Sequence, residues 1–471
     1  MTSGAAQLYL SGGFEPLQFE TELASLAIEG ELPPDLGGRF LRIGPNPQFP
    51  PRGAYNPLNG DGMIHAFRIG GGRVAYRNRW VRTRRWALEN AAGRALFGTS
   101  GDPRDRDPSV LGVAENGAAN TNLVWHGGRL LALEEGHGPI EMDPESLETL
   151  GDWRFDGRLP RNMTAHPKVD PATGEMLFFA NFQDGPTSAL ALHVADAQGR
   201  LARSWTIEAP WPALVHDFAV TERFVVFVVC PATLSMERLR AGRPPLAWEP
   251  ELGCVVGVAP RDGGEARWRP APAAMVWHLM NAFEDGERVV VDLCEQGAAM
   301  FPATDGTPPD EARAVQRLAR WTLEPDGDVA RMVLWDGPCE YPRIDERRTG
   351  RRHRYGYLAC DGGPGSGDPF HRGLARFDFE TGDLARWSAG PRCAVGEPVF
   401  AAGLGGGEAD GHILTTVFDE VAAASHLAIL RAGDLAAGPV ARAYVGHRVP
   451  MGFHALWIPT SAEPPSSPGS A

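Results

Sequence analysis

Short apolar runs separated by turn residues recur along this chain from about residue 38 to residue 458. Such runs, each four residues long, occupy residues 40–43, 130–133, 176–179 and 288–291. Glycine-rich turn signals lie at residues 69–72, 171–174, 284–286, 326–327 and 381–382. Many short strands without interleaved helices indicate an all-β fold, and at this length a propeller is favoured because radial repetition protects its sheet edges.

Helical periodicity is weak, and it predicts helices only over residues 84–98 and 308–319. The last residues, 461–471, are rich in Ser, Pro and Ala, which predicts a disordered tail after one β domain over residues 1–460. The 57 Gly and 41 Pro are spread along the chain, as expected for many turns.

Charge and cysteine content narrow the function classes. The formal net charge is −14 and no basic block is present, which argues against nucleic acid as a partner. The six cysteines show no CxxC pair, so we expect buried free thiols in a reducing compartment. The N-terminal residues lack a signal-peptide pattern and no run is long enough to span a bilayer, which predicts a cytoplasmic protein with at most weak membrane-surface contact.

Four of the 13 histidines stand at the edges of predicted strands with apolar neighbours: His166, His216, His278 and His454. Neutral imidazole is a good ligand for iron, copper, zinc and nickel. The gaps of 50, 62 and 176 residues form no local metal motif, so spacing alone leaves a shared ion open. The other histidines lie in polar contexts, and we expect solvated side chains for His126, His137, His193, His353, His371, His412, His426 and His447.

Three carboxylates stand in similar strand-edge contexts: Glu135, Glu340 and Glu397. A carboxylate that accepts the second ring N–H of a ligand histidine fixes its tautomer, and this is the role expected here if a metal is bound. The alternative for each is a solvated or ion-paired surface carboxylate. The Gly-rich stretches at 362–366 and 403–407 fit no nucleotide-binding motif, so no organic cofactor is expected.

Ordered motifs along nearly the whole chain resemble the carotenoid cleavage oxygenase family. They include residues 38–47 (Gly-Arg-Phe-Leu-Arg-Ile-Gly-Pro-Asn-Pro), 59–65 (Asn-Gly-Asp-Gly-Met-Ile-His), 164–168 (Thr-Ala-His-Pro-Lys), 215–218 (Val-His-Asp-Phe), 277–284 (Trp-His-Leu-Met-Asn-Ala-Phe-Glu), 340–345 (Glu-Tyr-Pro-Arg-Ile-Asp), 396–400 (Gly-Glu-Pro-Val-Phe) and 450–454 (Pro-Met-Gly-Phe-His). The resemblance implies a seven-bladed β-propeller with a loop or helix cap over its active site.

The same resemblance implies Fe(II) on the propeller axis, held by His166, His216, His278 and His454. Glu135, Glu340 and Glu397 would then each bond to one of three of these histidines. The methyl group of Thr121 would crowd one open coordination position of the iron, and an ordinary structural role for Thr121 in a strand is an equally good interpretation. His65 matches no ligand position.

The implied reaction is the cleavage of a conjugated C=C bond by O2 into two carbonyl products, without haem, flavin or pterin. Alternatives that the sequence leaves open are a non-oxidative isomerase or hydrolase at the same iron, and a non-catalytic propeller that binds a partner.

The hydrophobic substrate is expected to be an aromatic alkene or a carotenoid or apocarotenoid. Residues 236–245, 256–261 and 300–302 resemble the bacterial lignostilbene-type branch. That branch carries a lysine before the equivalent of Glu135, to bind a phenolic oxygen, and this chain has Glu134 there. Many relatives carry an aromatic residue where this chain has Leu58. Leu58, Glu134 and Phe283 are therefore predicted as pocket residues.

Overall fold

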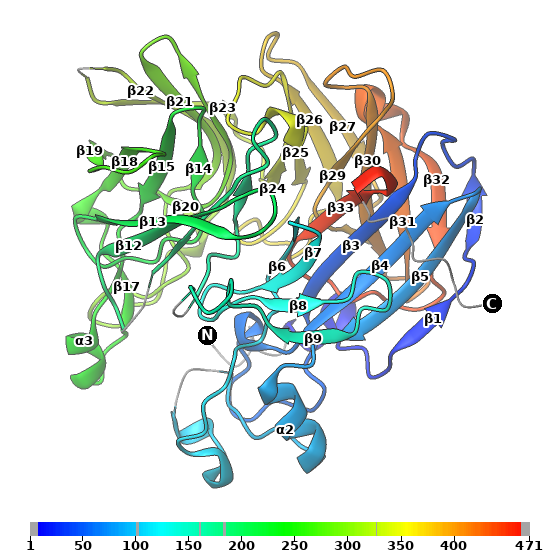
Figure 1. Ribbon diagram of the computed structural model, residues 1–471, viewed down its shortest axis with the longest axis horizontal. Helices are drawn as coiled ribbons and strands as arrows, with labels where there is room; N and C mark the ends of the chain where they lie inside the picture. The colour runs from blue at the N-terminus through cyan, green and yellow to red at the C-terminus, as the bar shows by residue number, and fades with distance from the viewer. Residues whose placement is uncertain (1–7, 100–102, 160–161, 182–184, 326, 463–471) are drawn as a thin grey trace. The chain divides into compact units, whose positions relative to one another are not determined.

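The computed structural model describes residues 8–99, 103–159, 162–181, 185–325 and 327–462, and these residues fold mainly into β-strands (Figure 1). The chain divides into two compact units. Unit 1 comprises Met1–Pro160, Gln198–Arg200 and Pro391–Ala471, and unit 2 comprises Arg161–Ala197 and Leu201–Gly390. Of the predicted tail, residues 461–471, only the first two are described, and the part from residue 463 onward lies outside the described residues.

Unit 1 contains three sheets, one of which joins the two ends of the chain, because the late strand β33 pairs with the early strand β3. Their register places Ala455 opposite Arg42, so the loop before β33 is fixed against β3. The first sheet has the order β1 (Thr21–Leu23), β5 (Arg73–Trp80), β4 (Gly62–Gly70), β3 (Gly38–Pro45), β33 (Ala455–Pro459). The second is β6 (Asn122–His126), β7 (Arg129–Leu133), β8 (Ile140–Met142), β9 (Thr149–Asp152). The third is β2 (Ala27–Gly30), β32 (Pro439–Tyr444), β31 (Ala424–Arg431), β30 (Gly411–Asp419), with β28 (Cys393–Val395) and β29 (Val399–Ala402) both on β30.

Unit 2 contains four four-stranded antiparallel sheets and a two-stranded ribbon. The sheets are β10 (Lys168–Val169), β11 (Met176–Ala180), β12 (Ala189–Ala195), β13 (Leu201–Glu208); β14 (Ala219–Val220), β15 (Phe224–Val229), β18 (Cys254–Pro260), β19 (Arg267–Ala271); β20 (Met275–Asp285), β21 (Arg288–Gln296), β22 (Arg317–Leu323), β23 (Val329–Trp335); and β24 (Cys339–Arg343), β25 (Tyr355–Cys360), β26 (Gly373–Asp378), β27 (Leu384–Ser388). The ribbon is β16 (Ala232–Leu234) with β17 (Leu246–Trp248).

The strands form where the sequence pattern predicts them. All four apolar runs lie inside strands, namely β3, β7, β11 and β21. Between β4 and β5 the two turn residues Gly71 and Gly72 have φ of 58° and 71°, the left-handed conformation that a two-residue hairpin turn requires. Apolar side chains of β15, β18, β20, β21 and β22 then pack into one core around the fully buried Trp321. This core supports the strand that carries His278.

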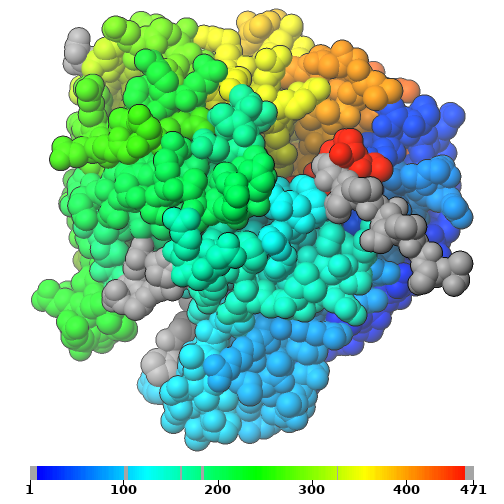
Figure 2. All heavy atoms as spheres, in the orientation of Figure 1, coloured from blue at the N-terminus to red at the C-terminus, as the bar shows by residue number. Residues whose placement is uncertain are grey.

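The helices are few and short. The prediction over residues 84–98 is confirmed in part by α2 (Arg84–Ala92), which Thr83 caps by accepting from the Trp86 amide and which Gly93 ends in the left-handed conformation. With the short helical turns that follow, α2 forms a lobe on the outside of unit 1, coloured blue to cyan in Figure 2. The other predicted helix, over residues 308–319, is wrong: only Glu311–Arg313 form a helical turn, and β22 begins at Arg317 because its apolar residues pair with β21. A second short α-helix, α3 (Met236–Arg240), links the two strands of the ribbon.

None of the helices among the described residues is long and apolar enough to cross a lipid bilayer. The predicted free thiols are confirmed: all six cysteines are unbridged, and five of them are buried while Cys393 is half-buried.

Candidate metal centre

Three of the predicted ligand histidines lie together in unit 2. The Nε2 atoms of His166 and His216 are 3.0 Å apart. The ring of His278 is 5.0 Å from that of His166 and 5.2 Å from that of His216, centroid to centroid. His166 and His216 are buried, and His278 is half-buried. The side chains therefore meet where little water reaches them.

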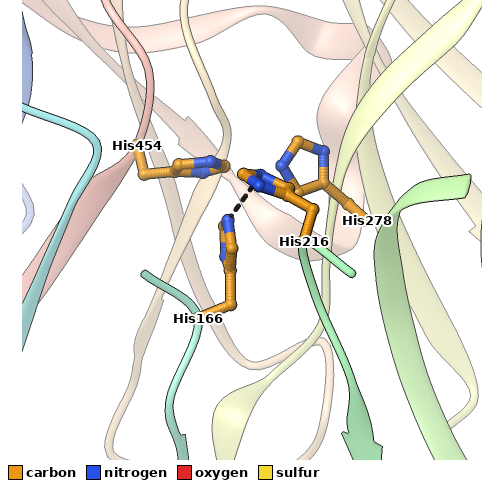
Figure 3. Close-up of side chains that lie close together, drawn as sticks. All are labelled: His166, His216, His278 and His454. Atoms are coloured by element: carbon orange, nitrogen blue, oxygen red, sulfur yellow. Dashed lines mark hydrogen bonds between the residues drawn. The ribbon is translucent and has the colours of Figure 1, made fainter. Parts of the chain in front are cut away.

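Figure 3 draws His454 with these three histidines, and one ring nitrogen of each of the four lies within 4.8 Å of the others. His454 itself is held within unit 1: its amide donates to the Thr121 carbonyl over 3.3 Å, and its carbonyl accepts from the Ile43 amide over 3.0 Å. Among the described residues, no other group of three or more His, Cys, Asp or Glu side chains has this arrangement.

Irregular backbone presents the histidines. His278 lies within β20, whose pairing with β21 slips between Val276 and Leu279 and again before Asn281. A β-bulge of this kind turns a strand side chain away from its regular direction. His166 and His216 stand in loops just before β10 and β14, and His454 stands just before β33.

Glu340 orients His278. Its Oε2 accepts from Nδ1 of His278 over 2.9 Å and from the Tyr341 amide, while its Oε1 accepts from Gln316 Nε2 over 3.0 Å. Tyr341 has a φ of 54° and stands where the pairing of β24 with β25 slips, so the backbone beside Glu340 turns back toward the carboxylate. An ionised carboxylate only accepts, so Nδ1 of His278 carries the proton and Nε2 is the nitrogen with the lone pair.

Glu397 holds His454 in the same manner. It is buried between β28 and β29, its Oε1 accepts from Nδ1 of His454 over 3.0 Å, and its Oε2 accepts from the Ala455 amide over 2.6 Å. Glu340 and Glu397 thus each bond to one histidine of the cluster, and their role behind metal ligands stays a prediction. Glu135 follows β7 and is half-buried; its predicted role stays a prediction.

The donor set fits a divalent transition-metal ion. Two ligand nitrogens that are each about 2.1 Å from one ion and meet at a right angle are about 3.0 Å apart, the separation seen for His166 and His216. Uncharged imidazoles with carboxylates behind them suit iron, copper or zinc, whereas Mg²⁺ and Ca²⁺ prefer oxygen ligands.

Thr121 and two of the predicted pocket residues lie in unit 1. Thr121 is buried directly before β6, and its Oγ1 donates to Asn120 Oδ1 over 2.9 Å. Asn120 Nδ2 in turn donates to the carbonyl of Leu58 over 3.1 Å, while the Leu58 side chain is 44% exposed. Glu134 accepts from His137 Nδ1 and, over 3.0 Å, from the Gly136 amide.

The Glu134 carboxylate therefore already has partners in its own loop. Burial acts to lower the pKa of His137, but the bonded Glu134 carboxylate outweighs it, so this pKa is raised above its usual value. Phe283 is buried in unit 2, with the Arg352 guanidinium 4.8 Å and the Arg320 guanidinium 5.6 Å from its ring centroid. Substrate contact by Leu58, Glu134 or Phe283 stays a prediction.

Sequence analysis missed several side chains that touch the histidines. Tyr341 stacks on His278 with ring centroids 5.8 Å apart, and Trp277 meets His216 edge-on at 5.2 Å. The expectation of solvated side chains is wrong for His126, His193, His353 and His371, which are buried. They lie on or beside strands, and residues from adjacent strands cover their side chains. Polar residues next to them in the sequence therefore do not indicate whether they are buried.

The family model described as retinal pigment epithelial membrane protein matches residues 14–459 of this chain. The chain belongs to this family, the carotenoid oxygenases. Isoeugenol monooxygenase from Pseudomonas nitroreducens is 36% identical over 473 residues, which cover 96% of this chain and 98% of that protein. The crystal structure of lignostilbene dioxygenase from Pseudomonas brassicacearum is 35% identical, with a TM-score of 0.90 over 96% of this chain and 98% of that one.

The crystal structure of cobalt-substituted apocarotenoid oxygenase from Synechocystis is 30% identical, with a TM-score of 0.86 over 97% of this chain and 99% of that one. The expected fold is confirmed: this carotenoid oxygenase is a seven-bladed β-propeller, as its match to the lignostilbene dioxygenase structure shows. Members of the family are iron enzymes, and four histidines of this chain form a cluster.

Proposed function

We propose that this chain binds one Fe(II) ion through His166, His216, His278 and His454 and uses O2 to split a conjugated C=C bond of an aromatic alkene into two carbonyl compounds. The observation that carries the proposal is the convergence of the four ring nitrogens, with Glu340 and Glu397 bonded to two of the rings. Both oxygen atoms enter the products, so the balance needs no reductant.

Iron, when bound, supplies the electrons that activate O2. The chain's own residues then have three tasks. Glu340 and Glu397 keep Nδ1 of their histidines protonated, which presents Nε2 as the ligand atom. Burial of His166, His216 and His454 limits the access of water to the reacting atoms. Trp277 and Tyr341 add aromatic rings beside His216 and His278, and the ring of an aromatic alkene would pack against them.

The substrate class is inferred from the relatives. One is named for isoeugenol, another for lignostilbene and others for resveratrol, all of which are alkenes conjugated with an aromatic ring. The named activities include both a monooxygenase and a dioxygenase, so the number of oxygen atoms incorporated is part of the test. We also place the protein in the cytoplasm, which its six unbridged cysteines support.

The test begins with iron content, for which we expect about one ion per chain. Purified protein is then given isoeugenol, resveratrol, a 4-hydroxystilbene and an apocarotenal, under air and under argon. The proposal is supported if the moles of O2 consumed equal the moles of each of two aldehyde products, and if both products carry an oxygen atom from ¹⁸O₂. Product without O2 uptake would indicate an isomerase or hydrolase instead, and iron without any product from the panel would contradict the assigned substrate class.

The matched variants are His278→Ala and His193→Ala. Both histidines lie in strands of unit 2, but His193 contacts Ser204 and Phe178 rather than the cluster. We expect His278→Ala to lose iron and activity and His193→Ala to keep its iron. A fully active, iron-replete His278→Ala protein would overturn the ligand assignment.

A further inference from the structure

The chain contains one lysine. Every other basic side chain among its 45 is an arginine, and the exception is Lys168, two residues after His166. Lysine and arginine are not equivalent, because lysine carries a compact point charge whereas arginine carries a wide planar fork. A single lysine in a chain that otherwise uses arginine therefore points to a position where the compact ammonium group fits better than a planar guanidinium.

Lys168 pairs with the residue next to a second histidine. Its Nζ donates to Oδ1 of Asp217 over 2.7 Å, and Asp217 directly follows His216. The Asp217 side chain is 2% exposed and that of Lys168 20% exposed. Nζ also lies over the Phe218 ring, 5.8 Å from its centroid.

Asp217 reaches the third histidine as well. Its Oδ2 accepts from the amide of Leu279, the residue after His278, over 2.8 Å, and its Oδ1 also accepts from the Phe218 amide over 2.7 Å. One buried carboxylate thus joins the segments that carry His166, His216 and His278. All of these residues belong to unit 2.

We propose that Lys168 and Asp217 are positioning residues that set the separation of the three histidines before a metal binds. The proposal rests on the proposed function, in which these histidines are ligands. The Asp217 carboxylate ties the bulge of β20 to the His216 loop, and the Lys168 ammonium ties the same carboxylate to the strand that follows His166. Without the ammonium, a buried carboxylate would keep its charge with only amide partners, so the loops would move to admit water.

The test compares Lys168→Met with a matched ion-pair variant. Arg320→Met removes the cation from the Arg320–Asp292 pair of the same unit, whose side chains are 20% and 0% exposed, close to the values for Lys168 and Asp217. No bond of that pair reaches the residues beside His166, His216 or His278. Fe(II) and Co(II) affinities are measured on metal-free protein by chelator competition, together with the visible spectrum of bound Co(II) and the Tm of the metal-free protein.

We expect Lys168→Met to weaken metal binding by about 10- to 100-fold, which is the usual loss of affinity when a group behind a metal ligand is changed. We also expect the variant to alter the visible spectrum of bound Co(II). Arg320→Met should lower Tm to a similar degree and leave metal affinity within about twofold, since a partner lost from a buried pair costs stability wherever it lies. Lys168→Arg should recover part of the affinity.

Two results would overturn the positioning role: a Lys168→Met protein with the metal affinity and Co(II) spectrum of the unaltered chain, or equal loss of metal affinity in Lys168→Met and Arg320→Met. Failure of the unaltered chain to bind either metal would contradict the proposed function instead, so the two failures are told apart.

Discussion

Nδ1 of His278, on β20, donates to Oε2 of Glu340, on β24, over 2.9 Å, and this bond joins two neighbouring sheets of unit 2. Because the carboxylate also accepts from Gln316 and from the Tyr341 amide, it is held in place independently of the histidine. The imidazole is therefore oriented by a fixed group, as a ligand histidine needs to be.

Glu340→Gln tests that orientation. The amide keeps the shape but can present its NH2 group toward His278, which disturbs the tautomer, so we expect iron affinity and kcat to fall by about 10- to 100-fold. Iron content after dialysis against a chelator is the measurement. The control is Glu295→Gln, a buried carboxylate bonded to Trp321 and Arg331, which should lose stability and keep its iron. Equal iron retention in both variants would contradict the role of Glu340.

Glu134→Gln tests the predicted substrate contact. If Glu134 accepts a bond from a substrate phenol, the variant keeps an acceptor oxygen but loses its charge. The weaker bond should raise KM for a 4-hydroxystilbene by about fivefold and leave KM for the 4-methoxy analogue unchanged. If the carboxylate serves only its own loop through His137 and Gly136, both substrates change alike. Steady-state kinetics with the substrate pair decide between the two.

Buried histidines predict that the protein loses stability in mild acid. Burial lowers the pKa of His353 to about 4, with Asp292 opposing the shift, whereas an unfolded histidine titrates near 6.5. The unfolded state then binds the proton first, so stability is full above the unfolded pKa and declines as pH falls from about 6.5 toward 4. Between pH 7 and pH 5 this one group contributes a loss of about 2 kcal/mol.

His353→Gln should flatten that pH dependence. The free energy of unfolding, measured by urea titration at pH 7 and pH 5, should differ between the two pH values by about 2 kcal/mol less in the variant than in the unaltered chain. His137→Gln is the control, because the pKa of His137 is raised and its removal cannot relieve a loss of this sign. An unchanged pH dependence in His353→Gln would contradict the assignment.

Thiol burial predicts the reactivity of the six cysteines. Cys393 is half-buried, while the other five are buried, and burial raises the pKa of Cys360 above the usual range of a thiol. A disulfide reagent should therefore titrate about one thiol quickly in the native protein and six after denaturation, because the thiolate is the reactive form. Rapid reaction of several thiols in the native protein would contradict this prediction, because it would show that the packing around the buried cysteines opens.

The sequence by itself determined most of the strands and turns, and its motifs singled out the four histidines that cluster in the structure. Apolar runs such as 176–179 and glycine pairs such as Gly71 and Gly72 act locally, because alternation and backbone freedom are properties of a few adjacent residues. The histidines were found through ordered motifs and not through their spacing, since their gaps of 50, 62 and 176 residues carry no local signal.

Tertiary structure decided what those side chains touch. The bulge at Trp277 and His278 depends on how β20 pairs with β21, and the burial of His353 depends on strands brought over it from elsewhere in the chain. Lys168 and Asp217 are 49 residues apart, and a single lysine was visible in the sequence, but its partner was not. Contacts of this kind form only when distant segments pack. The ordered motifs therefore pointed to the four histidines, whereas packing decided which groups bond to them.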